Sequence, residues 1–68
     1  MKNWETIYNS SNEIHIEIVR SILKEHGIES VIVNKKDSFY HFGTVEILVE
    51  HKNVLQSIKI IEDDIRFE

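Results

Sequence analysis

The sequence predicts an α+β fold in which two helices cover one face of an antiparallel sheet. Three observations predict it. Segments with helical and strand-like periodicity follow one another in the order strand, helix, strand, strand, helix. No helical segment separates the second strand from the third, which favours an antiparallel hairpin. The chain has 68 residues, and a chain of this length supports one hydrophobic core, so residues 1–68 are expected to form a single domain.

The first strand is expected at residues 4–8, WETIY, because aromatic and β-branched residues favour extended structure. The alternation of side chains along a strand puts Trp4, Thr6 and Tyr8 on one face. Trp4 is expected in the core, where a large aromatic side chain buries much apolar area. If the edge of this strand is open, Trp4 is instead expected to anchor an interface.

A helix is expected at residues 11–26, where apolar residues recur at steps of three and four. Ser10 and Glu13 have the spacing of a capping box, which predicts where the helix begins. Gly27 suits the left-handed position just past the helix end. Glu13 and Glu17 stand one turn apart on one face. Paired carboxylates can act in acid–base catalysis, but a solvated helix face is the expected role here.

The second half of the chain predicts two more strands and a second helix. The strands are expected at residues 28–33 and 44–50 around a loop at 34–43, and the helix at 52–63. Residues 64–68 are either a short fourth strand or a tail. This order fits a ferredoxin-like βαββα(β) sandwich, with the third strand between the first two. Without a fourth strand, the first strand has a bare edge that invites a partner chain.

The composition argues against several classes of protein. The absence of cysteine excludes disulfides and thiolate chemistry, and the net charge of -4 argues against a nucleic-acid binder. No apolar run is long enough to span a membrane and no signal peptide is apparent, so a cytoplasmic location is expected. No nucleophile and base stand in a recognisable context, and no two histidines have helical metal-ligand spacing. Neither an enzyme nor a metal or cofactor site is expected.

The loop at residues 34–43, NKKDSFYHFG, is the predicted partner-binding surface. An exposed Phe39–Tyr40 pair would serve as an interface hot spot, because aromatic side chains anchor interfaces. In the alternative, Phe39 or Phe42 folds under the hairpin and closes the open end of the core. Asp37 is expected to shape the turn by bonding nearby backbone groups. The predicted contact residues are Lys36, Asp37, Phe39, Tyr40 and Phe42.

Several segments together resemble a known family. They are Trp4, Ile7 and Tyr8, then the helix end Leu23-Lys24-Glu25-His26-Gly27-Ile28, and then Val33-Asn34, Asp37, Tyr40 and Gly43. Over residues 4–62 the chain resembles a small bacterial family of prokaryotic signal-transducing proteins, whose function is unknown. That family is similar in fold to the nitrogen-regulatory PII proteins. The resemblance implies a PII-like regulatory domain whose hairpin loop lies where PII proteins carry their partner-contacting loop.

The expected function is that of a small cytoplasmic regulatory module that acts by protein contact through loop 34–43 and a sheet edge. One alternative is a small-molecule sensor, for instance of a nucleotide, with its site in a cleft between subunits. Another is a structural assembly protein without a ligand. The expected partner is another protein or a second copy of the chain, and neither nucleic acid nor a membrane is expected.

Overall fold

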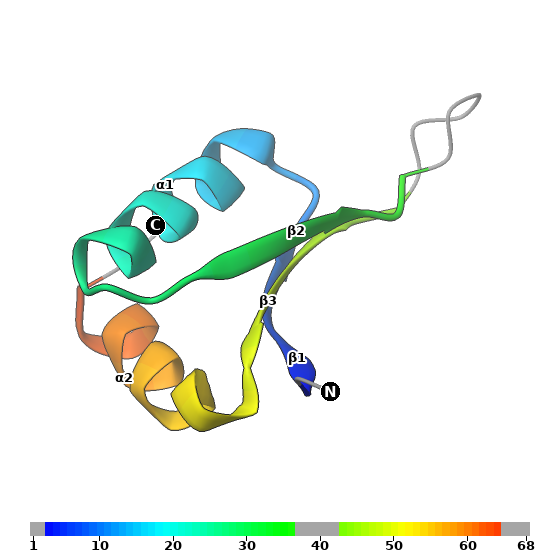
Figure 1. The fold of residues 1–68 in the computed structure, drawn as a ribbon. Coiled ribbons are helices and arrows are strands. Elements are labelled where there is room, and N and C mark those ends of the chain that lie inside the picture. Colours follow the sequence, from blue (N-terminus) through cyan, green and yellow to red (C-terminus); the bar gives the residue numbers. More distant parts are fainter. Residues whose placement is uncertain (1–2, 37–42, 65–68) are drawn as a thin grey trace.

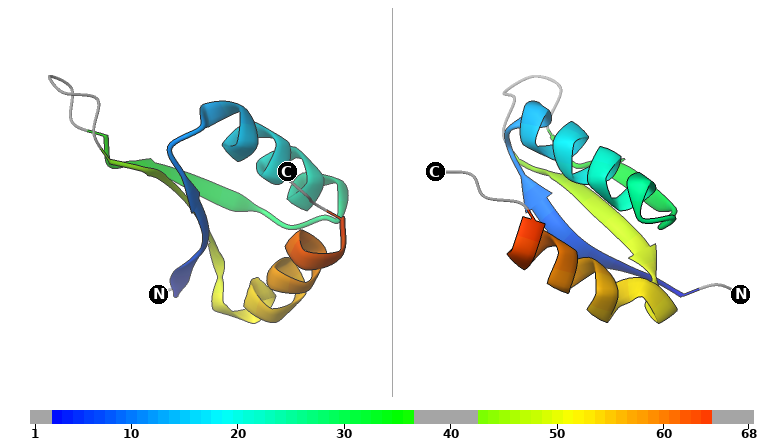
Figure 2. Two further views of the ribbon diagram at one scale, coloured as in Figure 1. Left: turned by 180° about the vertical axis from the view of Figure 1, so that it is seen from behind. Right: turned by 90° about the vertical axis from the view of Figure 1, so that its left-hand side faces the viewer.

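The computed structural model describes residues 3–36 and 43–64 and confirms the predicted α+β class (Figure 1). The elements are β1 (Trp4–Ser10), α1 (Glu13–Glu25), β2 (Ser30–Asn34), β3 (Val45–Glu50), a 3₁₀ turn (His51–Asn53) and α2 (Val54–Asp64). The strands form an antiparallel three-stranded sheet in the order β1-β3-β2. Figure 2 shows both helices on one side of this sheet, which is the predicted ferredoxin-like arrangement. Of the predicted fourth strand at 64–68, only Asp64 is described, and it ends α2.

The beginning of α1 differs from the prediction. The capping box expected from Ser10 is wrong, because Ser10 is the last residue of β1 and pairs with Val45. Asn12 caps the helix instead. Its Oδ1 accepts hydrogen bonds from the backbone N–H groups of Ile14 (2.9 Å) and His15 (3.4 Å). The Ser10 Oγ accepts from the Asn12 N–H at 3.0 Å, so the serine supports the residue that caps the helix.

The end of α1 follows the prediction. Gly27 adopts a φ of 76°, in the left-handed region that favours glycine. Its N–H donates to the Lys24 carbonyl and the Ile28 N–H donates to the Leu23 carbonyl, both at 2.9 Å. These two bonds form the Schellman motif. Ile28 is 4% exposed and enters the core directly after the motif, so β2 begins at Ser30 rather than at residue 28.

A bulge in β1 overturns the prediction that Trp4, Thr6 and Tyr8 share a face. Thr6 and Tyr8 pair with consecutive residues of β3, so Ile7 is an extra residue on β1. The extra residue turns Tyr8 toward the helices, where both Ile7 and Tyr8 pack against the core. Trp4 and Thr6 remain on the face that no described helix covers.

The core lies between the sheet and the two helices. The helix α2 packs against β1 and β3, whereas α1 contacts all three strands. The strand β3 lies in the middle, and its alternate residues point into the core, as its sequence pattern predicts. The buried apolar side chains are Ile16, Val19, Leu23, Ile28, Val45, Ile47, Val49 and Ile60.

Ser57 on α2 is buried (0% exposed), and its Oγ has no hydrogen-bond partner in the described part of the chain. A buried hydroxyl without a partner destabilises the folded state. We expect Ser57→Ala to raise the free energy of unfolding by about 1 kcal/mol, because it removes this hydroxyl and adds the best helix former. Urea unfolding measures the change. The control is Ser21→Ala at an exposed position of α1, which changes helix propensity alone. A loss of stability in Ser57→Ala would show that the hydroxyl has a partner.

Candidate functional site

The sheet has two outer edges, on β1 and on β2, because β3 lies between these strands. Two backbone hydrogen bonds show which groups point outward. The His51 N–H donates to the Asn3 carbonyl at 2.8 Å, and the Lys35 N–H donates to the Thr44 carbonyl at 2.9 Å. Hydrogen-bonded pairs alternate with non-hydrogen-bonded pairs along an antiparallel ladder. These two bonds therefore show which residues of β1 and of β2 bond to β3. Both bonds give the same assignment for the residues of β3.

On β1, the pattern turns the N–H and C=O groups of Trp4, Thr6 and Asn9 away from β3. The bond between His51 and Asn3 gives this assignment for Trp4 and Thr6, before the bulge. The bond between Lys35 and Thr44, followed through β3, gives it for Asn9, after the bulge. No described strand lies outside β1, so within the described part of the chain these groups form an open edge. The bulge at Ile7 divides the edge into two short segments.

On β2, the outward groups belong to Ser30, Ile32 and Asn34. The register between β2 and β3 runs without a bulge, and β2 contains no charged residue. The Asn34 Oδ1 accepts a hydrogen bond from the Lys36 N–H at 2.9 Å, which holds the chain as it leaves the strand. The edge of β2 is thus a regular, uncharged strand edge.

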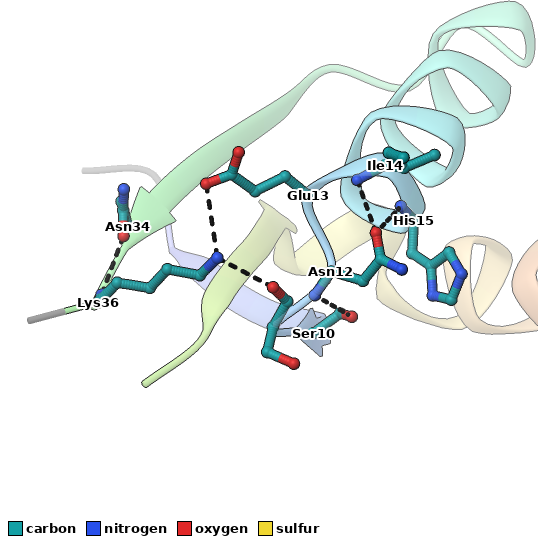
Figure 3. A network of polar contacts seen from close by, with 8 residues as sticks. Ser10, Asn12, Glu13, Ile14, His15, Asn34 and Lys36 are labelled. Carbon is teal, nitrogen blue, oxygen red and sulfur yellow. Dashed lines mark hydrogen bonds and ion pairs between the residues drawn. The ribbon is translucent and has the colours of Figure 1, made fainter. Parts of the chain in front are cut away.

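Lys36 joins the predicted loop to the start of α1 (Figure 3). Its Nζ donates to the Ser11 carbonyl at 2.9 Å and lies 3.5 Å from the Glu13 Oε1. The Lys36 side chain is 21% exposed, so other residues of the chain cover most of its surface. A role for Lys36 in contacting a partner stays a prediction. The other predicted contact residues, Asp37, Phe39, Tyr40 and Phe42, lie outside the described residues.

The face of the sheet opposite the helices carries apolar side chains. Trp4, Val33 and Leu48 are half-buried there, and Val31 is 43% exposed. Val31, Val33 and Leu48 share this face because successive side chains of β2 and β3 point to alternate faces of the sheet. Trp4 lies on it because the bulge at Ile7 breaks the alternation that would otherwise put Trp4 on the same face as Tyr8. Trp4 therefore does not lie in the core between sheet and helices. It lies at the start of β1, beside its bare edge.

A polar cluster crosses the same face from β1 to the start of the loop. The Thr6 Oγ1 donates to the Glu46 Oε1 at 3.0 Å, and the Lys35 Nζ lies 3.2 Å from the Glu46 Oε2. The Thr6 hydroxyl, followed by Lys35, holds the pKa of the Glu46 carboxyl below its ordinary value of 4.5. Because the folded pKa is lowered, the resulting stabilisation is present above the ordinary pKa and is lost as the pH falls through the lowered one.

Two hollows lie along the boundary between α1 and β2. The larger has a volume of about 440 Å³, and its lining includes Arg20, Lys24 and Ser30. The smaller has about 200 Å³, and its lining includes Glu17 and Ile32. Where β2 begins, the hollow thus has two basic side chains and one acidic one, Glu29, in its lining, and where β2 ends the lining has Glu13 and Glu17.

Sequence reasoning did not connect Arg20 and Lys24 with the acidic pair Glu13 and Glu17, although the spacing was visible. With Glu13 and Glu17 they stand at steps of four, three and four, which places all four side chains on one helix face. The acidic pair alone was interpreted, as a solvated face.

Among the described residues, no three His, Asp or Glu side chains converge as metal ligands. Of the histidines, His51 has its Nδ1 against the Glu5 carboxylate, and His26 caps the end of α1. Within the same residues, no helix combines the length and the apolar character needed to cross a membrane. The candidate sites in the described residues are therefore the outer edges of β1 and β2 and the surfaces beside them.

A family model described as "Putative prokaryotic signal transducing protein" matches residues 4–65. The match covers both helices and all three strands of the described sheet. No curated protein and no solved structure was found to match the chain.

Proposed function

Because the chain belongs to this family of signal-transducing proteins, as its resemblance predicted, we propose that it is a small regulatory module that acts by protein contact. The proposed contact surface is the outer edge of β1 together with the loop at residues 34–43. The outer edge of β1, which no described strand covers, is the single observation that carries the proposal.

The β1 edge supports this function because it can bind an extended segment of another protein. The outward N–H and C=O groups of Trp4, Thr6 and Asn9 would pair with the backbone of such a segment. The bulge at Ile7 interrupts the edge, so the partner segment is short. Short contacts bind weakly and reversibly, which suits a signalling interaction.

Side chains beside the edge would supply selectivity. Trp4 lies on the open face of the sheet next to the first outward backbone groups, and aromatic side chains are frequent interface anchors. In the loop, Phe39 and Tyr40 are proposed as further contacts. The hydrogen bond from the Lys36 Nζ to the Ser11 carbonyl ties the first described loop residues to the start of α1.

Site-specific photo-crosslinking in the source cells tests the proposal. A crosslinking residue at Asn9, on the β1 edge, is expected to give a discrete protein adduct. The same residue at Lys59, on the exposed side of α2, is expected to give none. Thr6→Pro should abolish the adduct, because it removes an outward N–H at an edge position where proline is tolerated. Thr6→Ala keeps this N–H and should retain the adduct.

The loop is tested in the same assay. Tyr40→Ala should leave the fold intact and weaken the adduct at Asn9. Unfolding of this variant would place Tyr40 in the core and remove it from the proposed surface. An adduct from Asn9 that survives Thr6→Pro would rule out strand pairing at β1. The small-molecule sensor stays a prediction.

A further inference from the structure

We propose that β2 pairs with β2 of a second copy of this chain, so that the two three-stranded sheets join into one across a twofold axis. This inference concerns a different edge from the proposed partner contact, and it stands or fails separately from it. It rests on the regularity of the β2 edge and on the charge pattern of the neighbouring helix face.

The β2 edge lacks the features that usually protect an edge strand from pairing. Edge strands in native proteins are blunted by charged residues, proline or bulges. The strand β1 has two of these features, Glu5 and the bulge at Ile7. The strand β2, SVIVN, has none of them and is rich in β-branched residues. Its regular edge therefore suits a lasting partner better than the edge of β1 does.

The outward backbone groups of β2 match those of a second copy. They belong to Ser30, Ile32 and Asn34 and are symmetric about Ile32. In an antiparallel pair centred there, Ile32 lies opposite the partner's Ile32, and Ser30 lies opposite the partner's Asn34. Every outward N–H and C=O group of β2 then meets a complementary group, as an antiparallel ladder requires.

The face of α1 beside β2 is complementary to itself in charge. It presents Glu13, Glu17, Arg20 and Lys24 in that order, and all four side chains are exposed. Arg20 and Lys24 form no ion pair with a described carboxylate of their own chain, and neither does Glu17 with a described cation. Of the four, Glu13 alone has a described cation nearby, the Lys36 Nζ at 3.5 Å. The face thus has an acidic half and a basic half, both available to another molecule.

The twofold axis through Ile32 crosses this helix face where its charge changes sign. Ile32 lines the same hollow as Glu17, whereas Ser30 lines the same hollow as Arg20. The axis at Ile32 therefore passes near the point between Glu17 and Arg20. Rotation about it brings the basic half of α1 toward the acidic half of the partner's α1.

Two pairs of opposite charges result on each side of the axis. Arg20 approaches the partner's Glu17, and Lys24 approaches the partner's Glu13. Arginine and lysine have long, flexible side chains, which can extend from α1 toward the partner's α1. Parallel pairing about a twofold axis would put the two α1 helices on opposite faces of the joined sheet, where these charges do not meet, so the charge pattern favours the antiparallel dimer.

Paired charge-reversal variants test this dimer. Glu13→Lys/Glu17→Lys makes the face entirely basic, and Arg20→Glu/Lys24→Glu makes it entirely acidic. Each variant alone should dissociate at least tenfold more readily than the wild type. An equimolar mixture should form a heterodimer, because both sets of charge pairs are then restored. Sedimentation equilibrium and native mass spectrometry measure the species present.

A matched control separates the interface from net charge. Glu25→Lys/Glu62→Lys makes the same change of net charge as Glu13→Lys/Glu17→Lys, at exposed positions off this face, and should dimerise like the wild type. The wild-type dimer should also weaken as salt rises, because exposed ion pairs are screened. The proposal is overturned if the wild type is monomeric up to about 1 mM. It is equally overturned if the mixture of variants stays monomeric.

Discussion

Ile47→Ala is expected to remove a large share of the free energy of unfolding of this protein. Ile47 lies on the central strand, is 0% exposed, and pairs with Tyr8 on one side and Ile32 on the other. Truncation of a buried isoleucine costs about 2–5 kcal/mol. A domain of this size has roughly 3–10 kcal/mol of stability in total. One substitution therefore removes a large share of the stability.

Urea unfolding followed by circular dichroism measures this effect. Leu55→Ala is the control, because Leu55 is 83% exposed on α2 and its truncation should change the stability by less than about 0.5 kcal/mol. A loss below about 1 kcal/mol for Ile47→Ala would contradict the placement of this side chain in the core.

Gly43→Ala is expected to cost about 2–3 kcal/mol, the second largest effect. Gly43 has a φ of 110°, which side chains rarely adopt. A Cβ atom there would also lie 2.6 Å from the carbonyl oxygen of Lys35. The substitution therefore strains the backbone and pushes apart the two strands where the hairpin loop begins and ends.

Gly27→Ala separates the two causes. Gly27 has a φ of 76°, but a Cβ atom there would meet nothing within 4 Å. Its substitution should cost about 1 kcal/mol, for backbone strain alone. If both alanine variants lost the same stability, the close approach of Lys35 to Gly43 would not be a feature of the protein in solution.

Much of the fold could be predicted because its signals are local. The alternation of Val45, Ile47 and Val49 predicts a strand buried on one face, and Gly27 predicts the end of α1. The bulge at Ile7 could not be predicted, because it depends on how β1 pairs with β3. The Asn12 cap was not predicted because Ser10 and Glu13 have the spacing of a capping box. Ser10 instead pairs with β3 as the last residue of β1, and Asn12 takes the capping position.

The candidate site was predictable only in part. The aromatic content of loop 34–43 pointed to a contact surface, and the element order pointed to a bare edge on the first strand. Which backbone groups face outward depends on strand register, which no local pattern contains. The charge order from Glu13 to Lys24 was visible as helical spacing, but its meaning required knowing that this face borders β2.

The two edges thus have different proposed roles. The regular edge of β2 suits lasting pairing between two copies, and the interrupted edge of β1 suits a brief contact with another protein. In the dimer, both β1 edges would lie at the outer ends of the joined sheet and remain accessible.

Amide hydrogen exchange, measured by NMR at low protein concentration, tests the free β1 edge most directly. The amides of Trp4, Thr6 and Asn9 are predicted to exchange rapidly, while those of Glu5 and Leu48, bonded within the sheet, are protected. Rapid exchange at these three positions would establish that the edge is open to a partner. Protection there as strong as at Glu5 would show that another part of the chain already pairs with β1, and the proposed contact surface would be wrong.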